Sequence, residues 1–206
     1  MSGRIAVLVH GLGTRHTDDS SLAELTPTLL AQGFVVCNFR YGFMSVIGAV
    51  VRNRKIAQEL HSILQSLVDY YDEILVIGHS NGCALMDMAS HNLQNNNKKI
   101  GYVYISPAAS VHKAPDHAIS WLDVWYNPRD YIIRLIRLAM RISLVIHRSQ
   151  WGLMGILGYR GADKRVTNFE LNIPNLNLAE QHVAFFKNLH QHLDFFKERI
   201  EQRFKN

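Results

Sequence analysis

The sequence has few cysteines and few prolines, with two Cys and five Pro among 206 residues. Cys37 and Cys83 each lie within an apolar segment, so we expect buried thiols and not the disulfide framework of a small secreted protein. Low-complexity tracts and internal repeats are also lacking. No secretory signal follows Met1 and no apolar run is long enough to span a membrane, so we expect a cytoplasmic protein.

Charged residues are modest in number, at 19% of the chain, and hydrophobic residues make up 48%. Both values are typical of a soluble globular protein, and the length suits a single α/β domain spanning residues 1–206. Lys and Arg exceed Asp and Glu by 22 to 17, a formal net charge of +5. This small excess predicts a modest attraction to anionic surfaces and argues against a nucleic-acid-binding protein.

Apolar segments typical of strands alternate with segments at helical spacing almost throughout the sequence. Because the short apolar runs are nonpolar at every position, we expect strands covered on both faces, as in a parallel sheet between helix layers. The alternation predicts a doubly wound, mostly parallel sheet of about six strands. The expected strands are residues 5–10, 34–39, 74–77, 100–105, 121–126 and 165–171, and the expected helices are residues 21–32, 44–71, 131–148 and 181–204, with one more after Gly82.

The start of the first expected helix is open from the sequence alone. Ser21 and Glu24 fit a capping box, which favours a start at Ser21. Pro27 favours a start at Thr26, because proline is tolerated in the first helical turn.

The segment around Ser80 is the most informative in the sequence. The apolar run at residues 74–77 leads into Gly78-His79-Ser80-Asn81-Gly82, and apolar residues at helical spacing follow. A strand, a tight turn and a helix in this order indicate a nucleophile elbow, which lifts a serine hydroxyl off the sheet. The elbow also places the next N–H, that of Asn81, at a helix start, where negative charge is favoured. A plain tight turn is the alternative.

The first expected strand leads into His10-Gly11-Leu12-Gly13. Two glycines this close also occur in phosphate-binding loops. Here Thr14-Arg15-His16 follows in place of a further glycine, and no Gly-Lys-Ser/Thr is present. The sequence therefore excludes nucleotide binding, and it predicts neither a metal ion nor a cofactor.

A histidine after the last expected strand is the best candidate for a base. In a doubly wound sheet, functional residues gather at the carboxyl ends of the strands. His182 lies beyond a loop after the last strand and directly before an apolar helical run that would anchor it. His190 and His192 lie too deep in the final helix, and we expect the side chain of His79 to point away from Ser80.

A carboxylate is suited to hold the imidazole of such a base. Asp130 follows the expected strand at residues 121–126 and is our candidate. Asp123, inside that strand, and Asp163, in a later connector, are its rivals. An ordinary helix N-cap is the alternative role for Asp130, and one residue can serve as both cap and acid.

Together these segments resemble the α/β hydrolases, in particular lipases and esterases. The resemblance rests on the loop at residues 10–13, on the elbow, and on the chain order Ser80, Asp130, His182. It covers nearly the whole chain in outline. It departs from the family at the start, because the loop follows the very first strand and the two antiparallel strands that open the family's sheet are missing. The resemblance implies a three-layer sandwich with a minimal core and no large cap domain.

The resemblance also implies a role for each residue. Ser80 would attack a carbonyl carbon, His182 would be its base, and Asp130 would hold the imidazole. The backbone N–H groups of Leu12 and Asn81 would form the oxyanion hole. The residues that would support these two motifs are His10, Gly11, Gly13, Gly78 and Gly82.

Two apolar segments bear on substrate and partners. Residues 43–51 leave a strand end beside the expected site, so Phe43 and Met44 either line a substrate pocket or begin a core helix. Residues 131–148 either pack on the sheet, contact an anionic membrane or pair with another subunit. That segment is apolar apart from a narrow stripe of four arginines, Arg134, Arg137, Arg141 and Arg148.

The sequence thus favours a serine hydrolase that cleaves a small-molecule or lipid carboxylic ester through an acyl-enzyme. A thioesterase, an amidase or an acyltransferase would use the same residues. The hypothesis from another class is a protein of this fold that binds a membrane or a partner with little turnover.

Overall fold

The computed structural model describes residues 3–13, 21–95, 97–142 and 151–205. Within them, six strands form one sheet in the order β2-β1-β3-β4-β5-β6. They are β1 (Arg4–Val9), β2 (Val35–Phe39), β3 (Glu73–His79), β4 (Lys99–Ile105), β5 (Trp121–Tyr126) and β6 (Val166–Glu170). Every pair of neighbouring strands is parallel. The doubly wound sheet expected from the sequence is confirmed.

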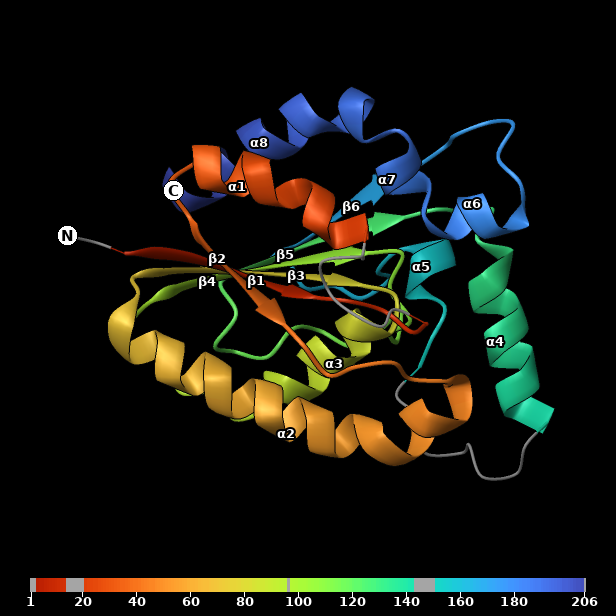
Figure 1. Cartoon of the computed structure of the whole chain (residues 1–206), viewed down its shortest axis with the longest axis horizontal. Helices are drawn as coiled ribbons and strands as arrows, with labels where there is room; N and C mark the ends of the chain where they lie inside the picture. The colour runs from red at the N-terminus through yellow and green to blue at the C-terminus, as the bar shows by residue number, and fades with distance from the viewer. Residues whose placement is uncertain (1–2, 14–20, 96, 143–150, 206) are drawn as a thin grey trace.

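Helices cover both faces of the sheet (Figure 1). One face carries α2 (Val46–Tyr70) and α3 (Asn81–Ala89), and the other carries η2 (Ser21–Leu25), α1 (Thr26–Ala31) and α8 (Leu189–Lys205). Three further helices lie toward the end of the molecule to which the strand arrows point, namely α4 (Tyr131–Ile142), α5 (Met154–Leu157) and α6 (Leu178–His182). The short α7 (Ala184–Lys187) connects α6 to α8.

The alternation of side chains along β1 shows why both layers are needed. Ile5, Val7 and Val9 are buried in the apolar cluster beneath α2 and α3. Ala6 and Leu8 point the other way, into the cluster formed with η2, α1 and α8. Both faces of β1 are therefore packed against helices and shielded from water, as expected for a strand of a parallel sheet.

The structure settles one helix start that the sequence left open, and it corrects one expected helix. The first expected helix is a 3₁₀ turn, η2, followed by α1 from Thr26, with Pro27 in the first turn of α1. The expected helix at residues 181–204 is three helices, α6, α7 and α8, because Val183 and Asn188 leave the helical conformation with φ of −109° and −123°. His182 is consequently the last residue of a short helix.

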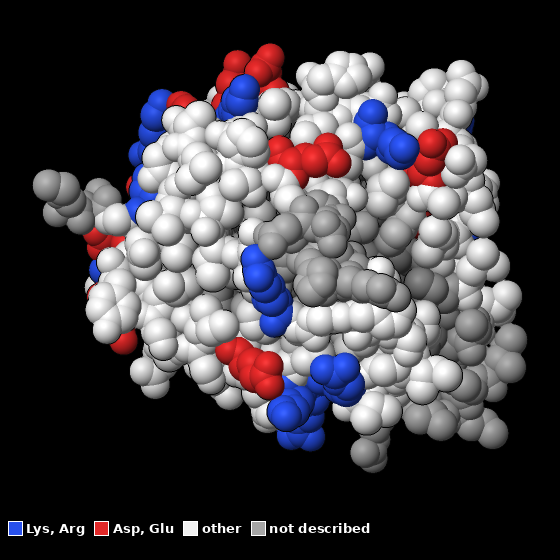
Figure 2. Space-filling view, viewed as in Figure 1, with Lys and Arg blue, Asp and Glu red and all other residues white. Residues whose placement is uncertain are grey.

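Charged side chains on the face seen in Figure 2 are scattered between wide uncharged areas. Both cysteines are free, with Cys83 buried and Cys37 half-buried. Burial raises the pKa of the Cys83 thiol well above its usual value. Within the described residues, no helix combines the length and apolar character needed to cross a membrane.

Candidate active site

The crossing direction of the chain reverses between β1 and β3. After β1 the chain adds β2 on one side, and it then returns to add β3 on the other side of β1. Such a switch point leaves a crevice at the carboxyl ends of the two strands, where ligands of doubly wound sheets bind. Val9 is in register with Gly78, so the loop after β1 and the turn after β3 meet at this switch point.

The turn after β3 holds Ser80 in a conformation that is unusual for a residue with a side chain. Its φ is 54° and its ψ is −118°, and the residue is buried. Two hydrogen bonds fix it, from the Ser80 N–H to the Ile105 carbonyl (3.0 Å) and from the Ala108 N–H to the Ser80 carbonyl (3.2 Å). Strained backbone of this kind persists only where the surroundings determine it, and it is concentrated at functional sites.

Two glycines allow α3 to begin directly against the sheet. A Cβ atom on Gly82 would collide with the Val9 carbonyl oxygen and lie 2.7 Å from the His10 carbonyl oxygen. A Cβ atom on Gly78 would collide with the Met86 sulfur. The absence of both atoms lets the first turn of α3 lie on the end of β1, which brings Asn81 to the loop at residues 10–13.

The loop at residues 10–13 is fixed by hydrogen bonds to its carbonyl groups. The Tyr41 hydroxyl donates to the carbonyls of His10 (2.7 Å) and Gly11 (2.9 Å), and His10 Nδ1 donates to the Gly11 carbonyl (2.8 Å). The two rings stack with centroids 3.9 Å apart. Burial lowers the pKa of His10 and raises the pKa of Tyr41, so the imidazole stays neutral and the phenol stays a donor. Further along, the Gly13 N–H donates to the Met44 carbonyl (3.2 Å).

Hydrogen bonds of its side chain hold Asn81 in place. Its amide forms a reciprocal pair with the buried amide of Asn53 on α2, with N···O distances of 2.8 and 3.2 Å. Its backbone N–H lies in the first turn of α3, where N–H groups have no acceptor within the helix. That N–H and the one of Leu12 are the two donors predicted from the sequence to form an oxyanion hole.

The predicted base and acid lie in contact. His182 Nδ1 is 2.7 Å from Asp130 Oδ2, and the two side chains are 12% and 0% exposed. A carboxylate accepts, so in the neutral form of the imidazole the proton is on Nδ1 and Nε2 has a lone pair. The other oxygen, Asp130 Oδ1, accepts from the Ile133 N–H (3.2 Å) at the start of α4. Asp130 therefore caps a helix and orients an imidazole at the same time.

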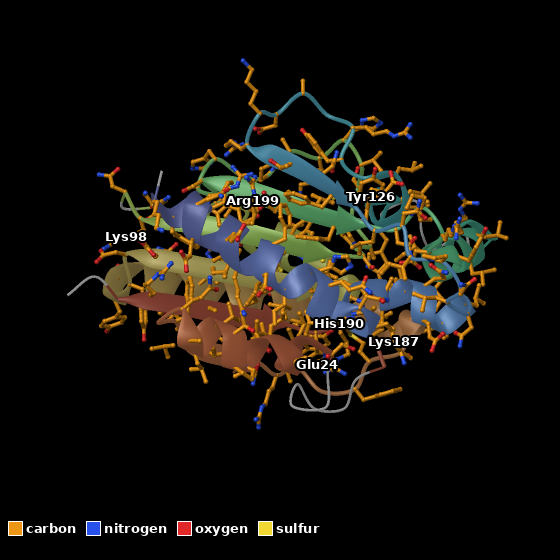
Figure 3. The ribbon with its side chains drawn as sticks, turned by 90° about the horizontal axis from the view of Figure 1, so that it is seen from above. Glu24, Lys98, Tyr126, Lys187, His190 and Arg199 are labelled. Carbon is orange, nitrogen blue, oxygen red and sulfur yellow. The ribbon has the colours of Figure 1, made fainter. Side chains whose placement is uncertain are left out.

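The rival residues make other contacts. Asp123, on β5, is buried and binds Arg199 (2.9 Å) and Arg203 (2.5 Å) of α8. Figure 3 shows Arg199 near the sheet and His190 at the opposite end of the same helix. Asp163 binds the nearby Arg165 at 2.7 Å. Asp123 thus joins α8 to the sheet, whereas Asp163 pairs with an arginine two residues away in the sequence.

His79 contacts His182, a contact that the sequence did not predict. Its ring centroid is 4.9 Å from that of His182, and the expectation that its side chain points away from Ser80 stays a prediction. His79 Nε2 donates to the main-chain carbonyl of His182 (3.2 Å). Burial, together with the neighbouring His182, lowers the pKa of His79 to about 3, so this ring is neutral near pH 7.

Asn127 is a second residue that the sequence did not identify. It is fully buried, and its Nδ2 donates to both the main-chain carbonyl and the side-chain Oε1 of Gln181, each at 2.8 Å. Its Oδ1 accepts from the Arg129 N–H (2.9 Å). Asn127 thus ties the loop that carries Asp130 to the helix that carries His182. Its only signal in the sequence is the pair Asn127-Pro128 directly after a strand, a pattern that is typical of a strand end.

Comparisons with known proteins identify the fold. Searches of protein-family models and of curated proteins found no match to the sequence. Solved structures do match. A metagenome-derived lipolytic enzyme, LipS or LipT, is 13% identical with a TM-score of 0.56 and covers 100% of this chain and 96% of its own. The α/β hydrolase MGS-M1 from a deep-sea metagenome library is 14% identical with a TM-score of 0.52, over 99% and 86%. A predicted CIB-like hydrolase from Thermoplasma acidophilum is 16% identical with a TM-score of 0.50, over 95% and 86%.

The fold is that of the α/β hydrolases. In this α/β-hydrolase fold the described sheet is parallel throughout, and the loop at residues 10–13 follows its first strand. Within the described residues, no group of three or more His, Cys, Asp and Glu side chains is arranged to hold a metal ion.

The two apolar segments singled out in the sequence are residues 43–51 and residues 131–148. Met44 is buried beneath α2, whereas Phe43 is 57% exposed. Their part in a substrate pocket stays a prediction. The arginine-bearing helix, α4, is described only to Ile142, so Arg148 and the side chains of Arg137 and Arg141 lie outside the described residues.

Proposed function

We propose that this protein is a serine hydrolase that cleaves carboxylic esters, with Ser80 as nucleophile, His182 as base and Asp130 as its partner. The observation that carries the proposal is the 2.7 Å hydrogen bond between His182 and the buried Asp130 carboxylate. It fixes the imidazole in the tautomer that leaves Nε2 free to accept a proton. Ser80 lies at the same sheet edge, in a strained turn typical of activated serines.

The proposed reaction begins with attack of Ser80 Oγ on the ester carbonyl carbon, while His182 Nε2 takes the hydroxyl proton. The N–H groups of Leu12 and Asn81 donate to the oxyanion that forms. Removal of one such donor typically costs about 2.7–4 kcal/mol of transition-state stabilisation. The carbon–oxygen bond to the alcohol then breaks, and His182 gives its proton to the departing alcohol.

The second half of the proposed reaction releases the acid. Water attacks the acyl group on Ser80, and His182 Nε2 takes a proton from that water. Collapse of the second tetrahedral intermediate breaks the bond to Ser80 Oγ, which recovers its proton from His182. A thioester, an amide or an acceptor other than water would use the same steps. The lipolytic activity named for a structural neighbour favours an ester.

A fluorophosphonate probe tests the nucleophile. Wild-type protein should be labelled and Ser80→Ala should not. Ser106→Ala is the matched control, because Ser106 is also a buried serine with positive φ (45°) directly after a neighbouring strand. Label that persists in Ser80→Ala removes Ser80 from the mechanism. A folded wild type that takes no label and cleaves no ester overturns the proposal and favours a binding protein of this fold.

A panel of aryl esters of graded acyl length tests the substrate class. His182→Ala should abolish hydrolysis of every member while leaving the thermal unfolding transition in place. Retention of most of the rate would exclude His182 as the base. Parallel assays with aryl thioesters and anilides distinguish an esterase from a thioesterase or an amidase.

A further inference from the structure

Exposed apolar side chains gather at two places in the described chain. The first is the start of α2, where Ile47 is 79% exposed and Val51 is 76% exposed. The second is α4, where Leu135 and Leu138 are 54% and 57% exposed. With their exposed neighbours they form what we name the apolar–basic face, whose apolar members are Phe43, Ile47, Val50, Val51, Tyr131, Leu135 and Leu138.

The start of α2 is apolar on its outer side as well as on its inner side. Ile47 and Val51 are one turn apart and face outward, while Ala49 and Asn53 are buried toward the sheet. A helix that only covers a sheet needs one apolar stripe. The outer stripe is therefore available to another apolar surface.

The charges of the two segments are all of one sign. From residue 40 to residue 58 the sequence has four basic residues, Arg40, Arg52, Arg54 and Lys55, and no Asp or Glu. The described part of α4 adds Arg134, and the sequence has no Asp or Glu from residue 131 to residue 142. In Figure 2, blue atoms and white surface, without red, cover the part of α2 toward its N-terminal end. An acidic surface fits this pattern best.

Both segments lie toward the end of the molecule to which the strand arrows point, where the candidate active site is (Figure 1). The start of α2 is also bonded directly to the candidate oxyanion loop, because the Gly13 N–H donates to the Met44 carbonyl (3.2 Å). The α2 part of the apolar–basic face thus begins next to the candidate site.

We propose that the apolar–basic face docks on an anionic lipid surface, with Ile47 and Val51 inserted among the lipids and the basic residues at the headgroups. Apolar residues bordered by cations are what such surfaces bind. A second copy of the chain fits less well, because a two-fold contact would bring the same basic residues against each other. The proposal goes beyond ester hydrolysis and does not depend on it.

Cosedimentation with vesicles of diether phospholipids tests the proposal, because these lipids have no acyl ester to cleave and binding is read without turnover. Wild-type protein should bind mixed phosphatidylcholine–phosphatidylserine vesicles and bind phosphatidylcholine vesicles more weakly. Ile47→Ser combined with Val51→Ser should weaken binding to the mixed vesicles about tenfold. Leu30→Ser combined with Tyr70→Ser is the matched control, because those side chains are 56% and 79% exposed elsewhere, and it should bind as wild type does.

A second variant tests the charges. Replacement of Arg52, Arg54 and Lys55 by Gln should remove most of the preference for phosphatidylserine while leaving the fold intact. The proposal is overturned if wild type binds neither vesicle, if the face variant and the control lose binding equally, or if Ile47 and Val51 instead drive dimerisation without lipid. Ester hydrolysis by a wild type that binds no vesicle would leave the proposed function standing while this proposal fails.

Discussion

His79 donates a hydrogen bond from Nε2 to the main-chain carbonyl of His182, across 103 positions of sequence. The donor is the residue next to Ser80, and the acceptor belongs to the residue that would be its base. Because β3 lies in the interior of the sheet, this bond fixes the position of His182 relative to the strand that leads to the candidate nucleophile.

Loss of that donor should slow the reaction without weakening substrate binding. His79→Leu removes the N–H and should lower kcat roughly 2- to 10-fold, the worth of one net hydrogen bond, with KM unchanged. His79→Gln keeps an amide N–H at the position of Nε2 and should retain most of kcat. Steady-state kinetics with one aryl ester compare the two, and equal losses in both variants would exclude the hydrogen bond as the cause.

The same ring should make the fold sensitive to acid. Its pKa falls from an ordinary 6.5 to about 3 in the folded protein, chiefly through burial. Between these values the unfolded chain binds a proton that the native chain does not. Stability is therefore complete above pH 6.5 and falls with decreasing pH, by at most roughly 1.4 kcal/mol per pH unit from this residue.

Denaturant unfolding at a series of pH values measures that slope. His79→Gln carries no titrating ring and should lose less stability than wild type as the pH falls from 6.5 toward 4. Parallel curves for the two proteins would show that His79 titrates normally in the fold.

Asn127 should matter for both stability and rate. Asn127→Ala leaves the two oxygens of Gln181 and the Arg129 N–H without this partner, at a cost of roughly 1–3 kcal/mol in unfolding free energy. Because Gln181 precedes His182, kcat should fall as well. Asn168→Ala is the control, since Asn168 bonds the Tyr159 backbone in the same way (2.8 Å each) away from the site. The control should lose stability and keep kcat, and an unchanged kcat in Asn127→Ala would limit Asn127 to a structural role.

The sequence predicted the elements that depend on local pattern. Continuous apolar runs indicated the strands, and Gly78 and Gly82 around Ser80 indicated the turn, where the structure leaves no room for a Cβ atom at either glycine. Asp130 and His182 were chosen as candidates because each follows a late strand, and the resemblance assigns them their roles by chain order. In each case the information lies within a short segment or in a known sequence of segments.

The contacts of His79 and Asn127 could not be predicted in that way. They join residues 103 and 54 positions apart, and their existence depends on how two loops approach over the sheet edge. The breaks at Val183 and Asn188 were missed for a related reason. Neither residue is glycine or proline, so the helical pattern runs across both positions in the sequence while the backbone turns.

Substitutions should distinguish the roles of two buried aspartates, Asp123 on β5 and Asp130 in the loop after β5. Asp130→Asn should lower kcat by about 10⁴-fold, because an amide can no longer select the Nδ1–H tautomer of His182. Asp123→Asn should keep kcat and lose up to about 3 kcal/mol of unfolding free energy. That loss is below the range for fully buried pairs because Arg199 and Arg203 are partly exposed. Kinetics and denaturant unfolding of both variants decide the matter, and the reverse pattern would make Asp123 the acid.

The close approach of α3 to β1 should be essential to the oxyanion hole. Gly82→Ala would drive a Cβ atom into the carbonyls of Val9 and His10, which are backbone atoms and cannot rotate away. The structure must then separate α3 from β1, at roughly 1–3 kcal/mol of stability. That shift also separates Asn81 from Leu12, so we expect kcat to fall about 10²-fold or more, as when one oxyanion donor is lost.

Gly33→Ala is the matched control for this prediction. Gly33 has a φ of +80° and open space around its Cβ position, so alanine there is strained without collision. It should cost about 1 kcal/mol of stability and leave kcat unchanged. Thermal unfolding and aryl-ester kinetics of the two variants separate collision from conformational strain. If Gly82→Ala behaves like Gly33→Ala, the contact between α3 and β1 does not align the two N–H groups, and the donors to the oxyanion must be sought elsewhere.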